Sequence, residues 1–394
     1  MEKKKNRKKI NNLILLIVLA VIFGLAGGVV GELITRVYIL EETYNIPFFG
    51  EINFSNGQFT GSSLIIRDPK KVVVEQDMKV AETITSVSNS LVGIFTKKPE
   101  IHINNIKEFN IENYYILNQS LGTGLVITSD GWVMTNAFRP DANPDRAISD
   151  YVIITREKKI FELDKFIKDP ITNFSFFHVK DARDLPVRQF SDKNLIIKGM
   201  QVIALNWQQA SLITSISDIK DDNVVLKFTD KFSKKIISQD QVEADLTSAI
   251  IFDLAGNIVG LSEKTGEIEP IYHFKSAISS LLLLKEIKRA SLGVNYINLS
   301  ELVLSANEET KDMINKGALI YKNNDGIDIV KNSSAEKAKL RAGDIITKVD
   351  NIEIDKNNDL VDVIQSYSAG GKINVTYIRT GEENAVEIEL GEIN

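Results

Sequence analysis

The side chains best suited to acid–base or metal chemistry are scarce in this sequence. Its 394 residues include no cysteine, so thiolate nucleophiles, thiolate metal sites and disulfides are excluded. No two of the three histidines, His102, His178 and His273, have the spacing that places metal ligands on one helix. A histidine metal site would have to combine distant segments, and His178 is expected at the surface or rim of its domain. We therefore expect no metal and no cofactor.

The middle of the chain indicates the scaffold that would position any site. From about residue 91 to residue 275, short β-type runs alternate with polar turns, as in GLVITSDGWVMTN, YVIITREKKIF and AIIFDLAGNIVGL. Many short strands of this kind predict a closed barrel or sandwich. A helical pattern with Met78, Ile84 and Val87 on one face precedes them, and SAISSLLLLKEIK predicts a closing helix.

The last hundred residues have a different pattern, with a boundary expected near residues 289–292. Small helices alternate with strands and glycine-centred turns, which predicts a compact α+β module. Asn357 or Asn358 is placed to cap the helix in NNDLVDVIQSY. The terminal segment KINVTYIRTGEENAVEIEL predicts a hairpin around Thr380-Gly381.

The N-terminus predicts a membrane anchor. Residues 1–9, MEKKKNRKK, form a basic head, and residues 10–31 contain no charge. This uncharged run is long enough to cross a bilayer, and the basic head is expected on the cytoplasmic side. A cleaved signal peptide is the alternative, but the run lacks a clean cleavage site. We assign 10–35 to a transmembrane anchor in contact with lipid and 36–75 to a juxtamembrane linker.

The charge distribution limits the partners of the outer part. The formal net charge is −6 and the head contributes +5, so the remainder carries −11. An acidic outer part is poorly suited to nucleic acid or anionic lipid. No nucleic-acid partner is expected.

Several motifs resemble the HtrA/Deg family of trypsin-like serine proteases with PDZ domains. SSAEKAKLRAGDIITKVDNIEI is similar to a sequence pattern of the family's PDZ domain, and GTGLVITSDGWVMTN is similar to the strands before the catalytic histidine. The resemblance covers roughly residues 70 to 394. It implies a mostly β fold, with a trypsin-like double β-barrel over 76–288 and an α+β PDZ domain over 289–394.

The resemblance also assigns three catalytic positions, and all three are substituted. Phe138 stands where the family has histidine, Asn173 where it has aspartate, and Thr247 where it has serine. Phenylalanine cannot accept a proton, and an unactivated threonine hydroxyl is a weak nucleophile. Asp245 and Leu246 replace residues of the turn that would bind the oxyanion. No catalytic residue is expected.

The PDZ resemblance implies a peptide-binding site instead. It assigns capture of a peptide carboxylate to Leu292, Gly293 and Val294 in the segment SLGV. The strand edge for the peptide would follow over 294–297. Leu360 and Ile364 would line the side-chain groove or, alternatively, fill the core of the module.

These observations favour a function without catalysis. The expected protein is an inactive HtrA-like homologue, single-pass in the cell membrane, with its bulk outside the cytoplasm. It would bind extracytoplasmic peptides, unfolded chains or free C-termini, or regulate an active homologue, and family resemblance suggests a trimer. The alternative is an active serine endopeptidase of envelope quality control with an unconventional site.

Overall fold

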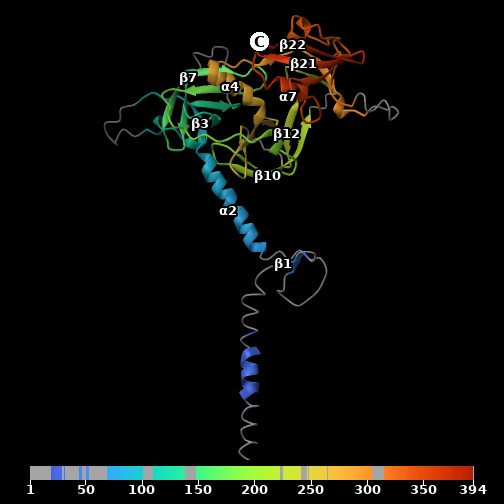
Figure 1. The fold of residues 1–394 in the computed structure, drawn as a ribbon. Helices are drawn as coiled ribbons and strands as arrows, with labels where there is room; N and C mark the ends of the chain where they lie inside the picture. The colour runs from blue at the N-terminus through green and yellow to red at the C-terminus, as the bar shows by residue number, and fades with distance from the viewer. Residues whose placement is uncertain are drawn as a thin grey trace, which may run out of the picture. The chain divides into compact units, whose positions relative to one another are not determined.

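A computed structural model describes most of the chain in two units, which divide after residue 69 (Figure 1). In the first unit, residues 19–28 are helical, and strand β1 (Tyr44–Ile46) pairs antiparallel with β2 (Gly50–Ile52). No helix among the described residues is both long and apolar enough to span a membrane. Most of the predicted anchor lies outside the described ranges, which are 19–28, 31, 44–46, 50–52, 69–100, 110–137, 148–221, 225–240, 246, 248–263, 265–303 and 315–393.

Helix α2 (Pro69–Ser88) leads into the β-rich part of the chain. Val87 is fully buried and Ile84 packs against the core, so the end of the helix is anchored as expected. Met78 is 59% exposed, so its predicted place on the packed face is wrong. The helix extends toward its N-terminus beyond the barrel core, so Met78 does not pack against that core even though the apolar pattern continues.

Six strands close a first barrel in the order β3-β4-β5-β8-β7-β6. In β3, Val92 and Ile94 point into this barrel, while Leu91 belongs to the core that both barrels share. The alternation of side chains along a strand places these residues on opposite faces. The strands are β3 (Leu91–Thr96), β4 (Gly122–Val126), β5 (Trp132–Thr135), β6 (Tyr151–Thr155), β7 (Ile160–Lys168) and β8 (Ser175–Val179).

A second six-stranded barrel closes in the order β10-β12-β15-β14-β13-β9, and α4 (Lys275–Leu284) follows it. The shared core combines residues such as Phe176 of the first barrel and Phe252 of the second. The predicted double-barrel architecture is confirmed. The strands are β9 (Gln201–Leu205), β10 (Ser211–Asp221), β12 (Lys234–Ser238), β13 (Ile250–Asp253), β14 (Ile258–Ser262) and β15 (Ile268–Pro270).

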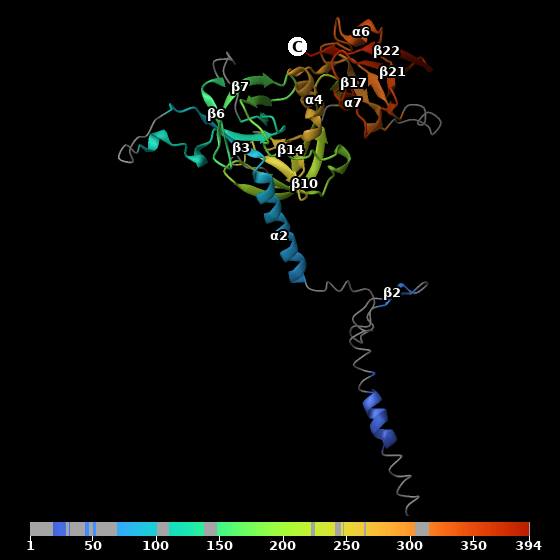
Figure 2. The ribbon, with the colours of Figure 1, turned by 60° about the vertical axis from the view of Figure 1, so that its left-hand side comes forward.

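The C-terminal module forms a separate sheet with its own core (Figure 2). Its strands follow the order β11-β17-β18-β19-β21-β22, with β20 paired to β19, while β16 pairs with β23. The elements are β16 (Ala290–Ser291), β17 (Asn295–Asn298), β18 (Ala318–Ile320), α6 (Ser334–Lys337), β19 (Ile345–Val349), β20 (Ile352–Glu353), α7 (Leu360–Ile364), β21 (Lys372–Arg379), β22 (Glu382–Glu389) and β23 (Gly391–Glu392).

Strand β11 (Leu226–Phe228) is the unexpected member of this sheet. It belongs to the connection between β10 and β12, which are neighbours in the second barrel. The tip of that hairpin therefore supplies the edge strand of the C-terminal sheet. Short 3₁₀ helices complete the described structure: η3 (Ile111–Asn113), η4 (Leu117–Gln119), η5 (Lys193–Leu195), η7 (Ile271–Phe274) and η8 (Leu299–Glu301).

Two turn predictions for the C-terminal module have different outcomes. β21 and β22 form the predicted hairpin, and both Thr380 and Gly381 have positive φ, as a tight two-residue turn requires. The predicted cap of α7 is wrong, because the capping position is Asp359 rather than Asn357 or Asn358. The Asp359 side chain makes no capping hydrogen bond and contacts other groups, described below.

Candidate functional site

The three positions assigned to a catalytic triad are only partly described. Phe138, Thr247 and Asp245 lie outside the described residues. Asn173 is described and exposed, in the turn between β7 and β8. β5 pairs with β8 through Thr135 and Ser175, so the segment leading to residue 138 leaves the barrel beside the turn of Asn173.

Hydrogen bonds connect the segments next to positions 138 and 247. The Asn136 side-chain amide donates to the Ser262 carbonyl at 2.7 Å. The Ser262 hydroxyl donates to the Leu246 carbonyl at 3.1 Å and accepts from the Ala249 amide at 2.8 Å. β14 thus holds the neighbours of both positions together, as a trypsin-like frame would.

Two features are described in the turn assigned to the oxyanion, a backbone hydrogen bond and a left-handed serine. The Ala249 amide donates to the Leu246 carbonyl at 2.9 Å, which closes a four-residue turn. Ser248 has a φ of 67°, a left-handed conformation that favours glycine. Leu246 is buried in the shared core. The turn is therefore anchored by an apolar side chain and contains a strained serine.

A buried ion pair supports the turn that carries Asn173. Asp169 and Arg289 are both fully buried, with Nη2 to Oδ2 at 2.5 Å and Nε to Oδ1 at 3.1 Å. The Thr172 hydroxyl donates to Asp169 at 2.7 Å. Because Arg289 immediately precedes β16, this pair joins the first barrel to the C-terminal module. Sequence reasoning missed the pair, because Asp169 and Arg289 are 120 residues apart and only the folded chain brings them together.

The two described histidines lie in different environments. His178 is partly exposed on the first barrel and contacts Asp164 at 2.6 Å, in agreement with the expected rim position. His273 is buried, hydrogen-bonds Glu269 and stacks on Phe232 with ring centroids 3.8 Å apart. The acidic group that the described residues bring within metal-binding distance contains neither histidine.

The loop assigned to carboxylate capture, residues 291–294, is bound to a carboxylate of this chain. The backbone N–H groups of Leu292 and Gly293 both donate to Oδ1 of Asp230 at 3.1 Å. The Ser291 hydroxyl donates to Oδ2 at 2.5 Å. We call residues 291–294 the carboxylate loop. Its hydrogen bonds resemble those expected for the C-terminus of a bound peptide.

The strand edge next to the carboxylate loop is filled as well. The Thr229 amide donates to the Val294 carbonyl, and the Val294 amide donates to the Thr229 hydroxyl, both at 3.0 Å. β11 then pairs antiparallel with β17, with Lys227 opposite Tyr296. We call residues 226–230 the docked segment.

The other residues assigned to peptide binding are covered. The side chains of Leu292, Val294, Leu360 and Ile364 are all fully buried in the core of the module. The docked segment and this core together leave none of them exposed.

Comparisons with known proteins agree with the double barrel and the C-terminal module. A family model described as "PDZ domain" matches residues 290–390. The serine protease Do-like HtrA of Lactobacillus helveticus is 24% identical over 424 residues, covering 98% of this chain and 96% of that protein. The chain is HtrA-like.

Another relative and a solved structure are also similar to this chain. The periplasmic serine endoprotease DegP of Escherichia coli (strain K12) is 22% identical, covering 69% of this chain. The match spans just over half, 57%, of that protein's length. The structure "HtrA-type protease AlgW with decapeptide" is 17% identical, has a TM-score of 0.53, and covers 80% of this chain and 98% of that chain, which shows the shared fold.

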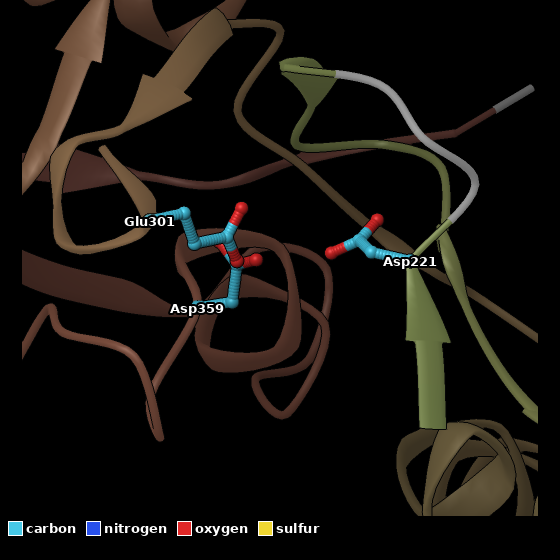
Figure 3. A group of neighbouring side chains, drawn as sticks. All are labelled: Asp221, Glu301 and Asp359. Atoms are coloured by element: carbon cyan, nitrogen blue, oxygen red, sulfur yellow. The ribbon is translucent and has the colours of Figure 1, made fainter. Parts of the chain in front are cut away.

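In this HtrA-like chain, three carboxylates surround one lysine of the docked segment. Figure 3 shows Asp221, at the end of β10, facing Glu301 and Asp359 of the PDZ domain. Lys227 Nζ lies 2.6 Å from Asp221, 2.6 Å from Asp359 and 2.7 Å from Glu301. The Lys227 side chain is 1% exposed. Burial would lower its pKa, but the three carboxylates raise it well above its ordinary value.

This acidic group has the ligand spacing of a metal site, but an ammonium group lies among its oxygens. Lysine supplies the compensating positive charge that a buried carboxylate needs. The group is therefore best described as a socket for a basic side chain. Sequence reasoning missed Lys227 and Asp230, because LKFTD is indistinguishable from an ordinary short strand and turn.

Proposed function

We propose that this HtrA-like chain captures C-terminal peptides through its PDZ domain outside the cytoplasm and does not cleave them. The observation that carries the proposal is the carboxylate loop, where Leu292 and Gly293 direct two backbone N–H groups at one carboxylate oxygen. Two converging donors suit the terminal carboxylate of a peptide, which is the usual ligand of a PDZ domain.

The absence of catalysis is supported by the residues at the triad positions. Phe138 offers no proton acceptor, Asn173 carries no charge, and Thr247 has no base to activate it. Leu246 anchors the oxyanion turn in the core. These substitutions favour binding over the alternative function, a serine endopeptidase with an unconventional site.

The basic head and the uncharged segment 10–31 support a single membrane anchor with the barrels and PDZ domain outside the cytoplasm. Relatives named as periplasmic endoproteases support the same side of the membrane. The family resemblance supports a homo-oligomer, with a trimer as the expected form.

One pair of measurements tests the function. The purified full chain should not react with a fluorophosphonate probe and should not degrade casein, with an active HtrA protease as the positive control. The chain with Asp230→Ala, which frees the carboxylate loop, should retain peptides from a random C-terminal library and lose them when their C-termini are amidated. Probe labelling that disappears in Thr247→Ala or Ser248→Ala would establish the endopeptidase instead.

The topology has its own test. Protease treatment of intact cells should degrade the part of the chain after residue 35 and spare the basic head, detected by an epitope tag at each end. Protection of the C-terminal tag in right-side-out cells would contradict the proposed orientation.

A further inference from the structure

The docked segment lies in the PDZ groove in the manner of a bound peptide. It adds an antiparallel strand to β17, and it presents a carboxylate to the N–H groups of the carboxylate loop. We infer that the docked segment is an internal ligand that closes this groove, and that the groove accepts in its place C-terminal peptides with a basic side chain two residues before the terminal residue. This inference rests on the proposed peptide-binding function.

The hydrogen bonds define how a peptide would align with the docked segment. Thr229 donates its amide to the Val294 carbonyl, so it occupies the place of a terminal residue. A free peptide would end there with its main-chain carboxylate. This chain continues to Asp230, and the Asp230 side chain supplies the carboxylate instead.

The side chains of the docked segment alternate as a strand requires. Lys227 and Thr229 are buried toward the PDZ domain, while Leu226 and Phe228 are half-buried. The basic side chain therefore enters the groove two residues before the position of the terminal residue.

The socket around Lys227 explains the expected preference. Asp359 is fully buried and accepts a hydrogen bond from the Tyr296 hydroxyl at 2.6 Å. If Lys227 leaves, Asp359 loses that ammonium group, and the nearest cation left among the described residues is Lys234 at 3.9 Å. Removing the closest cation from a buried carboxylate is unfavourable, so the groove should prefer a peptide that brings a positive charge.

Two further contacts hold the docked segment in the groove. The Gln365 side-chain amide donates to the Thr229 carbonyl at 3.0 Å and to the Ala290 carbonyl at 2.8 Å. Phe232, just after the segment, stacks on His273 beside a cavity of about 420 Å³. The Gln365 bond fastens the segment to the PDZ domain, and the Phe232 stack fastens its C-terminal flank to η7, which follows the second barrel.

The barrel holds both ends of the docked segment close to the groove. Asp221 and Lys234, where the segment's connection begins and ends, are paired across β10 and β12. A tethered ligand has a high effective concentration, so a free peptide competes with it at a disadvantage. The closed groove should consequently bind free peptides weakly until the segment is released.

Fluorescence anisotropy on the purified full chain tests the inference with four labelled peptides. The first peptide ends in Leu-Lys-Phe-Thr with a free carboxylate, and the second has the same sequence with an amidated C-terminus. The third and fourth have a free carboxylate, with Lys replaced by Glu or by Leu. The proteins are the wild type, Asp230→Ala, and Lys231→Ala as the matched control, because Lys231 is exposed beside the segment.

Asp230→Ala should bind the free Lys peptide at least about tenfold more tightly than the wild type, and Lys231→Ala should match the wild type. Amidation, or replacing Lys by Glu, should weaken binding to Asp230→Ala by about tenfold or more. Adding Asp359→Asn to Asp230→Ala should abolish the preference for Lys over Leu.

Hydrogen exchange of the wild-type chain tests displacement without any substitution. Saturating Lys peptide should speed exchange of amides in residues 225–230 and leave β22 unchanged. No change there, together with equal peptide affinity of the wild type and Asp230→Ala, would overturn the internal ligand. Equal affinity of Asp230→Ala for Lys, Leu and Glu peptides would overturn the basic preference but leave the proposed function intact. No carboxylate-dependent binding by either protein would overturn the proposed function itself.

Discussion

The turn of Asn173 and the carboxylate loop both depend on a carboxylate, but the two carboxylates have different partners. Asp169 is fully buried and forms a two-point ion pair with Arg289. Asp230 is half-buried, and its carboxylate accepts from backbone N–H groups and hydroxyls. The first carboxylate is paired with a buried guanidinium, whereas the donors around the second are backbone N–H groups and a hydroxyl, which suit a peptide carboxylate equally well. We therefore call the Asp169–Arg289 ion pair the permanent contact, and the contact between Asp230 and the carboxylate loop the replaceable contact.

The largest expected effect comes from breaking the permanent contact. Arg289→Met should remove about 3–5 kcal/mol of unfolding free energy, because it leaves Asp169 buried without its cation. Urea unfolding of the full chain measures this. The control is Lys288→Met, because Lys288 is more exposed and pairs with Glu392 at the surface, where the expected change is about 0–1 kcal/mol. Equal losses in the two variants would contradict the structural role of the Arg289 pair.

A second buried ion pair should make stability depend on pH. Burial alone would raise the pKa of Glu269, but its hydrogen bond with His273 and the charge of Lys235 lower it to about 2 from an ordinary 4.5. Ionised Glu269 therefore contributes stability above pH 4.5, and this contribution is lost as the pH falls toward 2. The loss should reach about 3 kcal/mol.

Thermal unfolding between pH 6 and pH 2 measures this loss for the wild type and Glu269→Gln. The difference between the two proteins should shrink as the pH falls. Glu353→Gln, at an exposed ion pair with Lys316, serves as the control and should have a flatter profile. A constant difference between the wild type and Glu269→Gln would show that the stabilisation does not come from the charge.

The replaceable contact can be tested by changing the backbone of the carboxylate loop at Gly293. Gly293 has a φ of 77°, and a Cβ there would lie 2.5 Å from the Ser333 Cβ. Gly293→Val should distort the carboxylate loop and weaken binding of free-carboxylate peptides more than tenfold, about 1.4 kcal/mol, in an Asp230→Ala background. Gly326→Val is a matched control, because Gly326 has a φ of 79° but open space around its Cα. Equal peptide binding by the two variants would exclude a role for the carboxylate loop.

The smallest expected effect comes from restoring the triad. Phe138→His, Asn173→Asp and Thr247→Ser together should leave casein cleavage near background, because the oxyanion turn is not restored. Loss of one oxyanion donor costs about 10²–10³ in rate. Adding Asp245→Gly and Ser248→Gly should give the first measurable activity, since Ser248 already has the left-handed φ that glycine favours. Strong cleavage by the triple variant alone would show that the oxyanion turn is intact.

Local patterns were enough to predict a closed barrel or sandwich and the hairpin at Thr380-Gly381, while the family resemblance supplied the double barrel. Short alternating strands, glycine positions and motif order are properties of neighbouring residues, so they can be read directly. The membrane anchor, the triad positions and peptide capture stay predictions based on those same local features.

The docked segment depends on contacts between residues far apart in the sequence, so it could not be predicted. The Gly293 amide and the Asp230 carboxylate are 63 residues apart along the chain, and only the folded chain brings them together. The cap prediction for α7 failed for a related reason. Asp359 occupies the capping position, but its carboxylate is taken by Lys227 and Tyr296.

The short strand β11 also covers a sheet edge that would otherwise be exposed. Without it, β17 would be the edge of the PDZ sheet and would present unpaired N–H and C=O groups, a template on which strands of other molecules can add. β11 replaces that edge with one of only three residues, and a short edge strand gives other molecules little to pair with. A chain in which residues 226–230 are cut to a plain turn should therefore aggregate at concentrations where the intact chain stays in solution.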